Sequence, residues 1–379
     1  MGMIDYESFG RDLSALGHEL RARTGRADWH HLRLLEWGGR ICMLLGLATA
    51  WLWPNPLSVF LIAQGMMVRF TIGHHVGHGS YENVPGMPAH YARKVFARGF
   101  RRFLDWPEWW NLDDWRYTHN ELHHPHTQSP LDADLMGEEV RMHLPMAVRY
   151  FLFAFATITW KFTYYAPRMH RERRARDAGL TRSARYEMKS ADLLDGGDPI
   201  VRQLWLRDYA PYVAVRFALP TLLASLLGPW AAFSMFVNLV FAELLHNAQT
   251  FICIRPNHCA GDIPLFGSRY ESRTEFFLQS VLGTINYQAG GNVIDMLHGW
   301  TNYQIEHHLW PKITLLQYQR ARPRVMEICR RHGIPYRVDN VFVRYARTAR
   351  IFVGLDHSPV IETKTLLKAG TLPEAQVAA

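Results

Sequence analysis

Two long segments with almost no charged side chains constrain the fold of this 379-residue chain more than any other feature. They cover residues 41–73 and 210–246. Each is about twice as long as one membrane-spanning helix, because about 20 residues at 1.5 Å rise cross roughly 30 Å of hydrocarbon. A turn signal lies near the middle of each, "WPNPLS" at 53–58 and "LLGPWA" at 226–231, so we predict two helical hairpins. The expected spans cover about 38–54, 57–73, 210–227 and 229–246.

The distribution of basic residues predicts which side of the membrane the other segments occupy. The first 40 residues hold six arginines, and the stretch from Lys161 to Arg207 is richer still, whereas neither hairpin turn carries a charge. Because Lys and Arg near membrane helices stay on the cytoplasmic side, we expect both termini and this middle stretch there. The net charge of +8 then reflects topology and contact with anionic lipids, and we expect no nucleic-acid partner.

Histidines are numerous, 20 in all, and three short clusters hold those whose spacing is informative. The clusters contain His74 and His78 in "GHHVGHG", His119, His123 and His124 in "HNELHH", and Gln304, His307 and His308 in "YQIEHHLWP". Residues three or four positions apart lie on one face of a helix, so each cluster can aim its side chains at one point. Neutral imidazole binds iron, zinc and copper, and the hairpins return all three clusters to one membrane face. We therefore predict a metal site there, with the clusters on the cytoplasmic side.

His246 adds an eighth imidazole, because it ends an apolar span where an ionisable side chain usually has a function. Eight imidazoles exceed the needs of one ion and suggest two. The four cysteines show no Cys-x-x-Cys pairing, so we expect neither a disulfide framework nor a thiolate site. Two zinc ions would suit a hydrolase, usually with bridging carboxylates or hydroxide, whereas two irons suit oxygen activation, with the protein supplying orientation and a dry cavity. A site at the membrane edge suggests an apolar substrate.

Other positions support weaker predictions. No helical spacing directs a further set of histidines at a metal, and we expect orienting or structural roles for His75, His90, His126, His258 and His298. Four tryptophans fit an aromatic belt at the membrane interface, with plain packing as the alternative: Trp106, Trp109, Trp110 and Trp115. Residues 146–160 are apolar, but a fifth crossing would separate the clusters, so we place them in the interface. Residues 253–266 could shape a substrate entrance.

The three clusters resemble the histidine boxes of the membrane fatty acid desaturase superfamily. "HHVGH", "HNELHH" and "NYQIEHHLWP" are similar to its three boxes, and Gln replaces the first His of the third box, as in front-end acyl desaturases. The resemblance extends from about residue 55 to 325 and includes "PLDADL", where the family often has an Asp-x-Asp segment. It implies that the iron ligands are His74, His78, His119, His123, His124, His246, His307 and His308. Gln304 would be a further metal-binding or orienting residue, and Asp132 and Asp134 would accept the second ring N–H of ligand histidines. His298, just before the third box, departs from the family's pattern as an extra histidine that could bind metal or orient a ligand.

The resemblance also implies a fold and a reaction. We expect an all-α integral membrane protein with four spanning helices in two hairpins and a cytoplasmic helical cap that carries the boxes. The implied reaction is O₂-dependent desaturation of a fatty acyl chain at two iron ions. The sequence contains no His-Pro-Gly-Gly haem motif, so electrons from NAD(P)H would arrive through a separate ferredoxin, rubredoxin or cytochrome. The Arg-rich cytoplasmic face would attract such a carrier if it is acidic.

Several alternatives remain open at this stage. Fatty acid hydroxylation, or oxidative decarboxylation to a terminal alkene, would use the same site, and the second box has three residues between His119 and His123 where many desaturases have two. A membrane zinc hydrolase or receptor is the alternative of a different class, and a redox-inactive metal-binding scaffold is a third. We predict a cytoplasmic N-terminal segment (1–36), a membrane domain (37–345) and a C-terminal tail (346–379).

Overall fold

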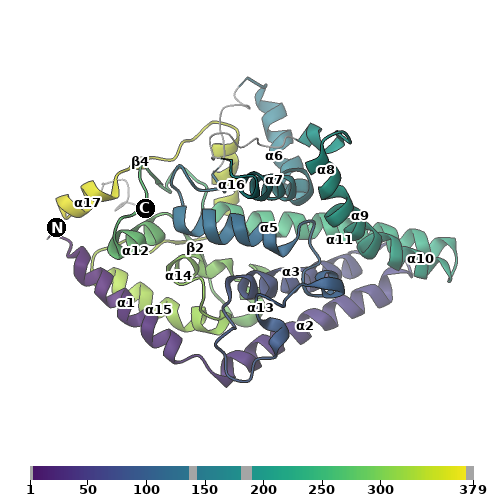
Figure 1. Ribbon diagram of the computed structural model, residues 1–379, viewed down its shortest axis with the longest axis horizontal. Helices are drawn as coiled ribbons and strands as arrows, with labels where there is room; N and C mark the ends of the chain where they lie inside the picture. Colours follow the sequence, from purple (N-terminus) through teal and green to yellow (C-terminus); the bar gives the residue numbers. More distant parts are fainter. Residues whose placement is uncertain (1–2, 136–142, 181–189, 373–379) are drawn as a thin grey trace.

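The computed structural model describes residues 3–135, 143–180 and 190–372, whose regular secondary structure is almost entirely helical, as predicted (Figure 1). The α-helices are α1 (Tyr6–Ala22), α2 (Arg26–Ala50), α3 (Pro56–His78), α4 (Arg102–Asp105), α5 (Leu112–Arg116), α6 (Met146–Trp160), α7 (Ala166–Asp177), α8 (Pro199–Leu204), α9 (Ala210–Val213), α10 (Leu219–Ser225), α11 (Pro229–Ile254), α12 (Arg273–Leu282), α13 (Gly291–Leu297), α14 (Gln304–Leu309), α15 (Leu315–Arg331), α16 (Val341–Phe352) and α17 (Thr363–Ala369). Two parallel pairs of very short strands join β1 (Leu265–Phe266) to β4 (Val360–Ile361) and β2 (Asn286–Tyr287) to β3 (Val338–Asp339). The ends of the predicted N-terminal segment and tail, residues 1–2 and 373–379, lie outside the described residues, and the predicted domain limits stay predictions.

Helices α2 and α3 form the first predicted hairpin, and glycines allow them to approach closely. A Cβ atom at Gly39 would lie 2.6 Å from Val68 Cβ, and one at Gly46 would lie 2.7 Å from Ile62 Cγ1. Small residues at helix contacts are the usual device for close packing in membranes. The tip of this hairpin is held to α11, because the Asn238 amide donates to the carbonyl of Ala50 and accepts from the backbone N–H of Asn55.

Two helices are long and apolar enough to cross a membrane, α3 and the segment Pro229–Asn257 that contains α11. This criterion rests on length and composition, and the described residues contain no further helix that meets it. Helix α2 begins at Arg26, well before the predicted span. The predicted span 210–227 instead contains one π-helical turn, Ala214–Ala218, and a second, Trp205–Tyr209, ends at the residue before the span. The four-span arrangement and its orientation therefore stay predictions.

Within the described residues, four π-helical turns interrupt the helices, and each is followed two residues later by a proline. The turns are η3 (Tyr117–His123), η5 (Lys161–Tyr165), η8 (Trp205–Tyr209) and η9 (Ala214–Ala218), and the prolines are Pro125, Pro167, Pro211 and Pro220. Proline has no N–H to donate and its ring crowds the carbonyl four residues earlier, so a wider turn before it relieves the conflict. The first of these turns contains the second histidine cluster.

The four tryptophans near this cluster are buried, so the aromatic-belt interpretation is wrong and packing is correct. Trp106, Trp109, Trp110 and Trp115 are between 0% and 8% exposed and belong to one hydrophobic cluster. Trp106 and Trp115 pack directly on α3, where a Cβ atom at Gly73 or Gly77 would overlap their rings. These contacts fix α3 and the second histidine cluster relative to each other.

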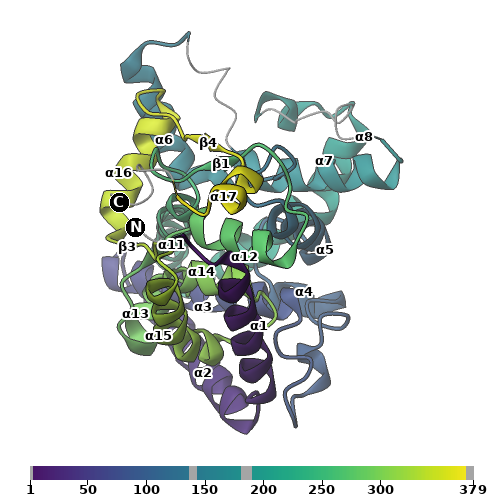
Figure 2. The ribbon, with the colours of Figure 1, turned by 90° about the vertical axis from the view of Figure 1, so that its left-hand side faces the viewer.

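The chain ends cover the third histidine cluster. Helix α14, which carries that cluster, packs against α12 and α15, and α1 packs against the same two helices. The C-terminal segment returns to α1, where the backbone N–H of Ile4 donates to the carbonyl of Gly370 at 2.9 Å (Figure 2). Helix α6, residues 146–160, lies along α11 and α16; its predicted place in the membrane interface is a prediction still.

Candidate metal centre

Histidines from four separate segments meet in the interior, at the end of α3. The segments are the last two turns of α3, the π-turn η3 with the following η4 (His124–His126), the residue after η10 (Arg255–Asn257), and α14. The imidazoles of the two groups described below are buried or nearly so. They divide into two adjacent groups, in contact through the stacked rings of His124 and His308, whose centroids lie 4.5 Å apart.

The first group contains His74, His78, His119 and His307, whose nearest ring nitrogens all lie within 4.8 Å of one another. His74 Nε2 lies 3.1 Å from His307 Nε2 and 3.2 Å from His78 Nε2. His124 joins this group, because its Nε2 lies 3.1 Å from His119 Nε2. Five imidazoles from all three predicted clusters therefore point at one place.

The second group contains His123, His258 and His308, again with ring nitrogens within 4.8 Å of one another. The Gln304 side-chain amide lies beside it, with its Nε2 position 2.9 Å from His258 Nε2 and 3.2 Å from His308 Nε2. The amide oxygen and nitrogen of Gln exchange places if the group is turned, so Gln304 can offer its oxygen to an ion. This group offers three imidazoles and one amide.

The π-turn explains how the second cluster serves both groups. In an α-helix, residues five positions apart point in different directions, whereas the wider π-turn brings positions i and i+5 together. His119 and His124, five apart, therefore face each other across the first group, and His123 turns to the second. We expected His119 and His123 to aim at one point, and their ligand nitrogens do lie within 4.8 Å of each other, with a carboxylate oxygen of Asp134 as near, although each ring also joins a different group.

Hydrogen bonds to Nδ1 orient three of the histidines. His123 Nδ1 lies 2.9 Å from Asp132 Oδ1 and 3.5 Å from Asp134 Oδ2, as expected for the Asp-x-Asp segment. His308 Nδ1 lies 3.0 Å from the Thr127 hydroxyl, and His307 Nδ1 lies 3.2 Å from the Tyr318 hydroxyl. An N–H on Nδ1 leaves the lone pair on Nε2, so these bonds aim a ligand atom at each group.

The geometry fits metal ions. Two ligands at right angles on an ion with bonds of about 2.1 Å are about 3 Å apart, which matches the nitrogen separations in the first group. Burial and the neighbouring imidazoles hold the pKa values of His119, His124 and His307 well below the usual value, so these rings are neutral and can bind a cation. Burial also disfavours charge on His123, but Asp132 and Asp134 outweigh it and raise its pKa.

His246 does not reach either group. Its Nε2 lies 2.8 Å from Lys161 Nζ and 3.1 Å from Glu108 Oε1, in a fully buried cluster of its own. The ring of Phe70 contacts both His246 and His74, with ring centroids 6.2 and 6.1 Å away. Helix α11 runs eight residues beyond His246, about 12 Å, so the chain reaches the centre only after the helix has ended.

His258 is the residue that sequence spacing missed. It follows the helical turn η10, and no second histidine stands three or four residues away, so no pattern marked it. The only sequence signal at this position was the proline in "RPNHC", which indicates a turn in the chain.

Two other histidines lie outside both groups. His75 lies against Tyr318 and His307. His298 lies apart, with Nδ1 2.8 Å from the carbonyl oxygen of Ile294 and its ring against Tyr287.

Replacing Asp132 with asparagine is expected to lower product formation by about 10- to 100-fold, because the His123 ring loses the carboxylate that orients it. The same change at Asp134, whose carboxylate is farther from His123, is the matched control and should cost less. Product formation per milligram of membrane protein, with each variant's folded yield from fluorescence-detected size exclusion, checks both. Equal effects of the two changes would contradict this role for Asp132.

Comparison with known proteins agrees with these boxes. The sequence profile described as "Fatty acid desaturase" matches residues 49–340. The chain is 24% identical over 377 residues to the "NADPH-dependent stearoyl-CoA 9-desaturase" of Mycobacterium tuberculosis, covering 93% of this chain and 80% of that protein. It is 22% identical over 292 residues to the "sn-1 linoleoyl-lipid 6-desaturase" of a Synechocystis strain, covering 72% of each. A 119-residue stretch is 31% identical to the "Delta(8)-fatty-acid desaturase 1" of Arabidopsis thaliana.

The profile covers more than half of the chain and contains all three histidine clusters. Members of the family act in lipid metabolism by iron-dependent catalysis, which suits a centre built from imidazoles. This protein therefore belongs to the fatty acid desaturase family and is an oxidoreductase.

Proposed function

We propose that this protein is an integral membrane enzyme that uses O₂ and two iron ions to introduce a double bond into a fatty acyl chain. The observation that carries the proposal is the pair of adjacent donor groups, which come from three histidine boxes and a fourth segment. The desaturase relatives, whose names specify stearoyl-CoA and linoleoyl-lipid substrates, support an acyl chain as the substrate class.

In this proposal each group holds one ion. The first ion would be held by His74, His78, His119, His124 and His307, and the second by His123, His258, His308 and Gln304. A pair of ferrous ions supplies the chemistry that reduces O₂ and removes hydrogen from an unactivated C–H bond. The protein would hold the ions through imidazoles, three of which Asp132, Thr127 and Tyr318 orient by hydrogen bonds to Nδ1.

The donor set favours iron over the zinc alternative. Structural and catalytic zinc ions usually have four ligands in a tetrahedron, three from protein in the catalytic case. Five imidazoles in the first group exceed that number and suit a metal with higher coordination. The carboxylate nearest the second group, Asp132, bonds to Nδ1 of His123, so it orients a ligand and does not bridge two zinc ions.

Expression in a bacterial host should produce an acyl chain of unchanged length with a new double bond. Gas chromatography with mass spectrometry of lipid methyl esters and headspace, against a host expressing the His307→Ala variant, checks this result. The variant should yield no such product, because it lacks a donor of the first group. A hydroxylated chain, or an alkene one carbon shorter, would retain the iron centre but overturn desaturation.

A further inference from the structure

A polar pocket of about 250 Å³ leads from the surface to the first group of histidines. His78 and His124 line it, and both are buried, 3% and 7% exposed. The outer lining includes Arg93, Arg116 and Lys312. Two proposed ligand rings therefore lie at the inner wall of a pocket whose outer wall is basic, and we call this feature the basic pocket.

Cations predominate around the basic pocket. Arg116 lies 3.6 Å from Asp113, which also pairs with the exposed Arg98, and Arg93 lies 3.2 Å from Glu82. Burial lowers the pKa of Arg116, Asp113 opposes this effect, and the positive charges of Arg93 and Arg98 lower it further, as expected for arginines crowded together. Lys312 is exposed and takes part in none of the ion pairs of the described residues.

The pocket is unsuited to the acyl substrate. A long alkyl chain requires an apolar tunnel, whereas the pocket is lined by arginines, lysine, Asn120 and Glu121, and its volume suits a handful of water molecules. It is a place where imidazoles of the centre approach the aqueous surface through little intervening protein. An electron delivered from outside the chain has a short route to the centre here.

We propose that the basic pocket and its rim are the docking site of a small acidic electron-carrier protein, which delivers electrons to the centre past His78 and His124. This inference rests on the proposed function, because only a redox centre requires such a partner. A carrier with carboxylates around an exposed cofactor edge matches the cations around the pocket. Complementary charge of this kind raises the association rate and fixes the orientation of the partner.

Charge reversal at Lys312 tests the proposal. The iron-loaded enzyme is assayed for acyl desaturation with NADPH, ferredoxin–NADP reductase and an acidic plant-type [2Fe–2S] ferredoxin. Lys312→Glu is expected to raise the KM for ferredoxin by about tenfold, through slower association. It should also weaken the rise of KM with salt that the unmodified enzyme shows, because salt screens exposed charges. Each variant's rate with reduced methyl viologen, a small reductant that needs no protein docking, is its reference.

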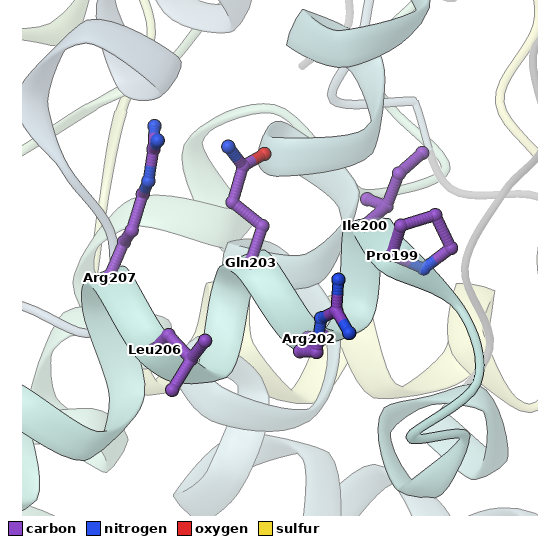
Figure 3. Close-up of a pocket in the computed structure, with 6 residues that line it drawn as sticks. All are labelled: Pro199, Ile200, Arg202, Gln203, Leu206 and Arg207. Carbon is purple, nitrogen blue, oxygen red and sulfur yellow. The ribbon is translucent and has the colours of Figure 1, made fainter.

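Arg207→Glu provides the matched control, since it changes the net charge equally. Arg207 is exposed on η8 and lines a separate pocket with Arg202 and Leu206 (Figure 3). Its KM for ferredoxin should not change. An unchanged KM for ferredoxin in Lys312→Glu, or an equal rise in both variants, would overturn the docking site. So would an enzyme that is active with reduced methyl viologen but inactive with ferredoxin. Failure of both reductants to produce a desaturated chain would instead overturn the proposed function.

Discussion

Replacing His258 with alanine is expected to abolish product formation, with a loss of at least about 100-fold, and to reduce the bound iron from two ions per chain to about one. The reason is that His258 is one of only three imidazoles in the second group, beside a weaker amide donor. The other two imidazoles, His123 and His308, cannot hold an ion as firmly without it.

His246→Ala is the matched control, because His246 was the ligand expected from the sequence. It lies against Lys161 and Glu108, so its loss should leave both ions bound and cost about 1–3 kcal/mol of stability through a missing buried hydrogen bond. Iron per chain, by plasma mass spectrometry of purified variants, and acyl product are measured together. Iron loss in His246→Ala with full occupancy in His258→Ala would contradict the assignment.

Replacing Lys161 with methionine is expected to destabilise the fold by about 3–5 kcal/mol, because it leaves a buried carboxylate without its cation. The Lys161 and Glu108 side chains are 0% and 1% exposed, and Nζ lies 2.8 Å from Glu108 Oε2. The ammonium group also lies 4.7 Å from the ring centre of Phe70, on the helix that carries His74. The pair therefore connects three parts of the fold: η5, the loop that precedes α5, and helix α3.

Thermal unfolding in detergent checks this effect, and a fall of about 5–10 °C in Tm is expected for Lys161→Met. The double variant Lys161→Met with Glu108→Gln removes both charges and should recover part of the loss, since two neutral groups can be buried at lower cost. A double variant that is no more stable than Lys161→Met would contradict a role for the pair in neutralising buried charge.

The sequence predicts the hairpin turns and the three histidine clusters well because both depend on local signals. The proline- and glycine-containing stretches "WPNPLS" and "LLGPWA" mark the turns directly, and His74 with His78 lies on an ordinary α-helix, where positions i and i+4 share one face. The resemblance in the third box likewise identified Gln304, His307 and His308 as neighbours. In each case the residues that interact are close together in the chain.

The parts that could not be predicted depend on distant packing or on an unusual helix. Pro125 widens the turn before it, and this wider turn, not the spacing alone, assigns His123 and His124 to different groups. His258 joins the centre because α11 continues past His246 before the chain turns, a length that hydropathy does not define. Trp106 and Trp115 are buried because glycines on α3 make room for them, 30 to 40 positions earlier in the chain.

The most direct test of the account is the mass of the product formed from perdeuterated stearic acid by cells that express the protein in air. The account predicts an acyl chain of unchanged length that has lost two deuterium atoms from neighbouring carbons, and no such product without O₂. A chain that has lost one deuterium atom and gained a hydroxyl group, a shortened alkene, or the same product under nitrogen would contradict it.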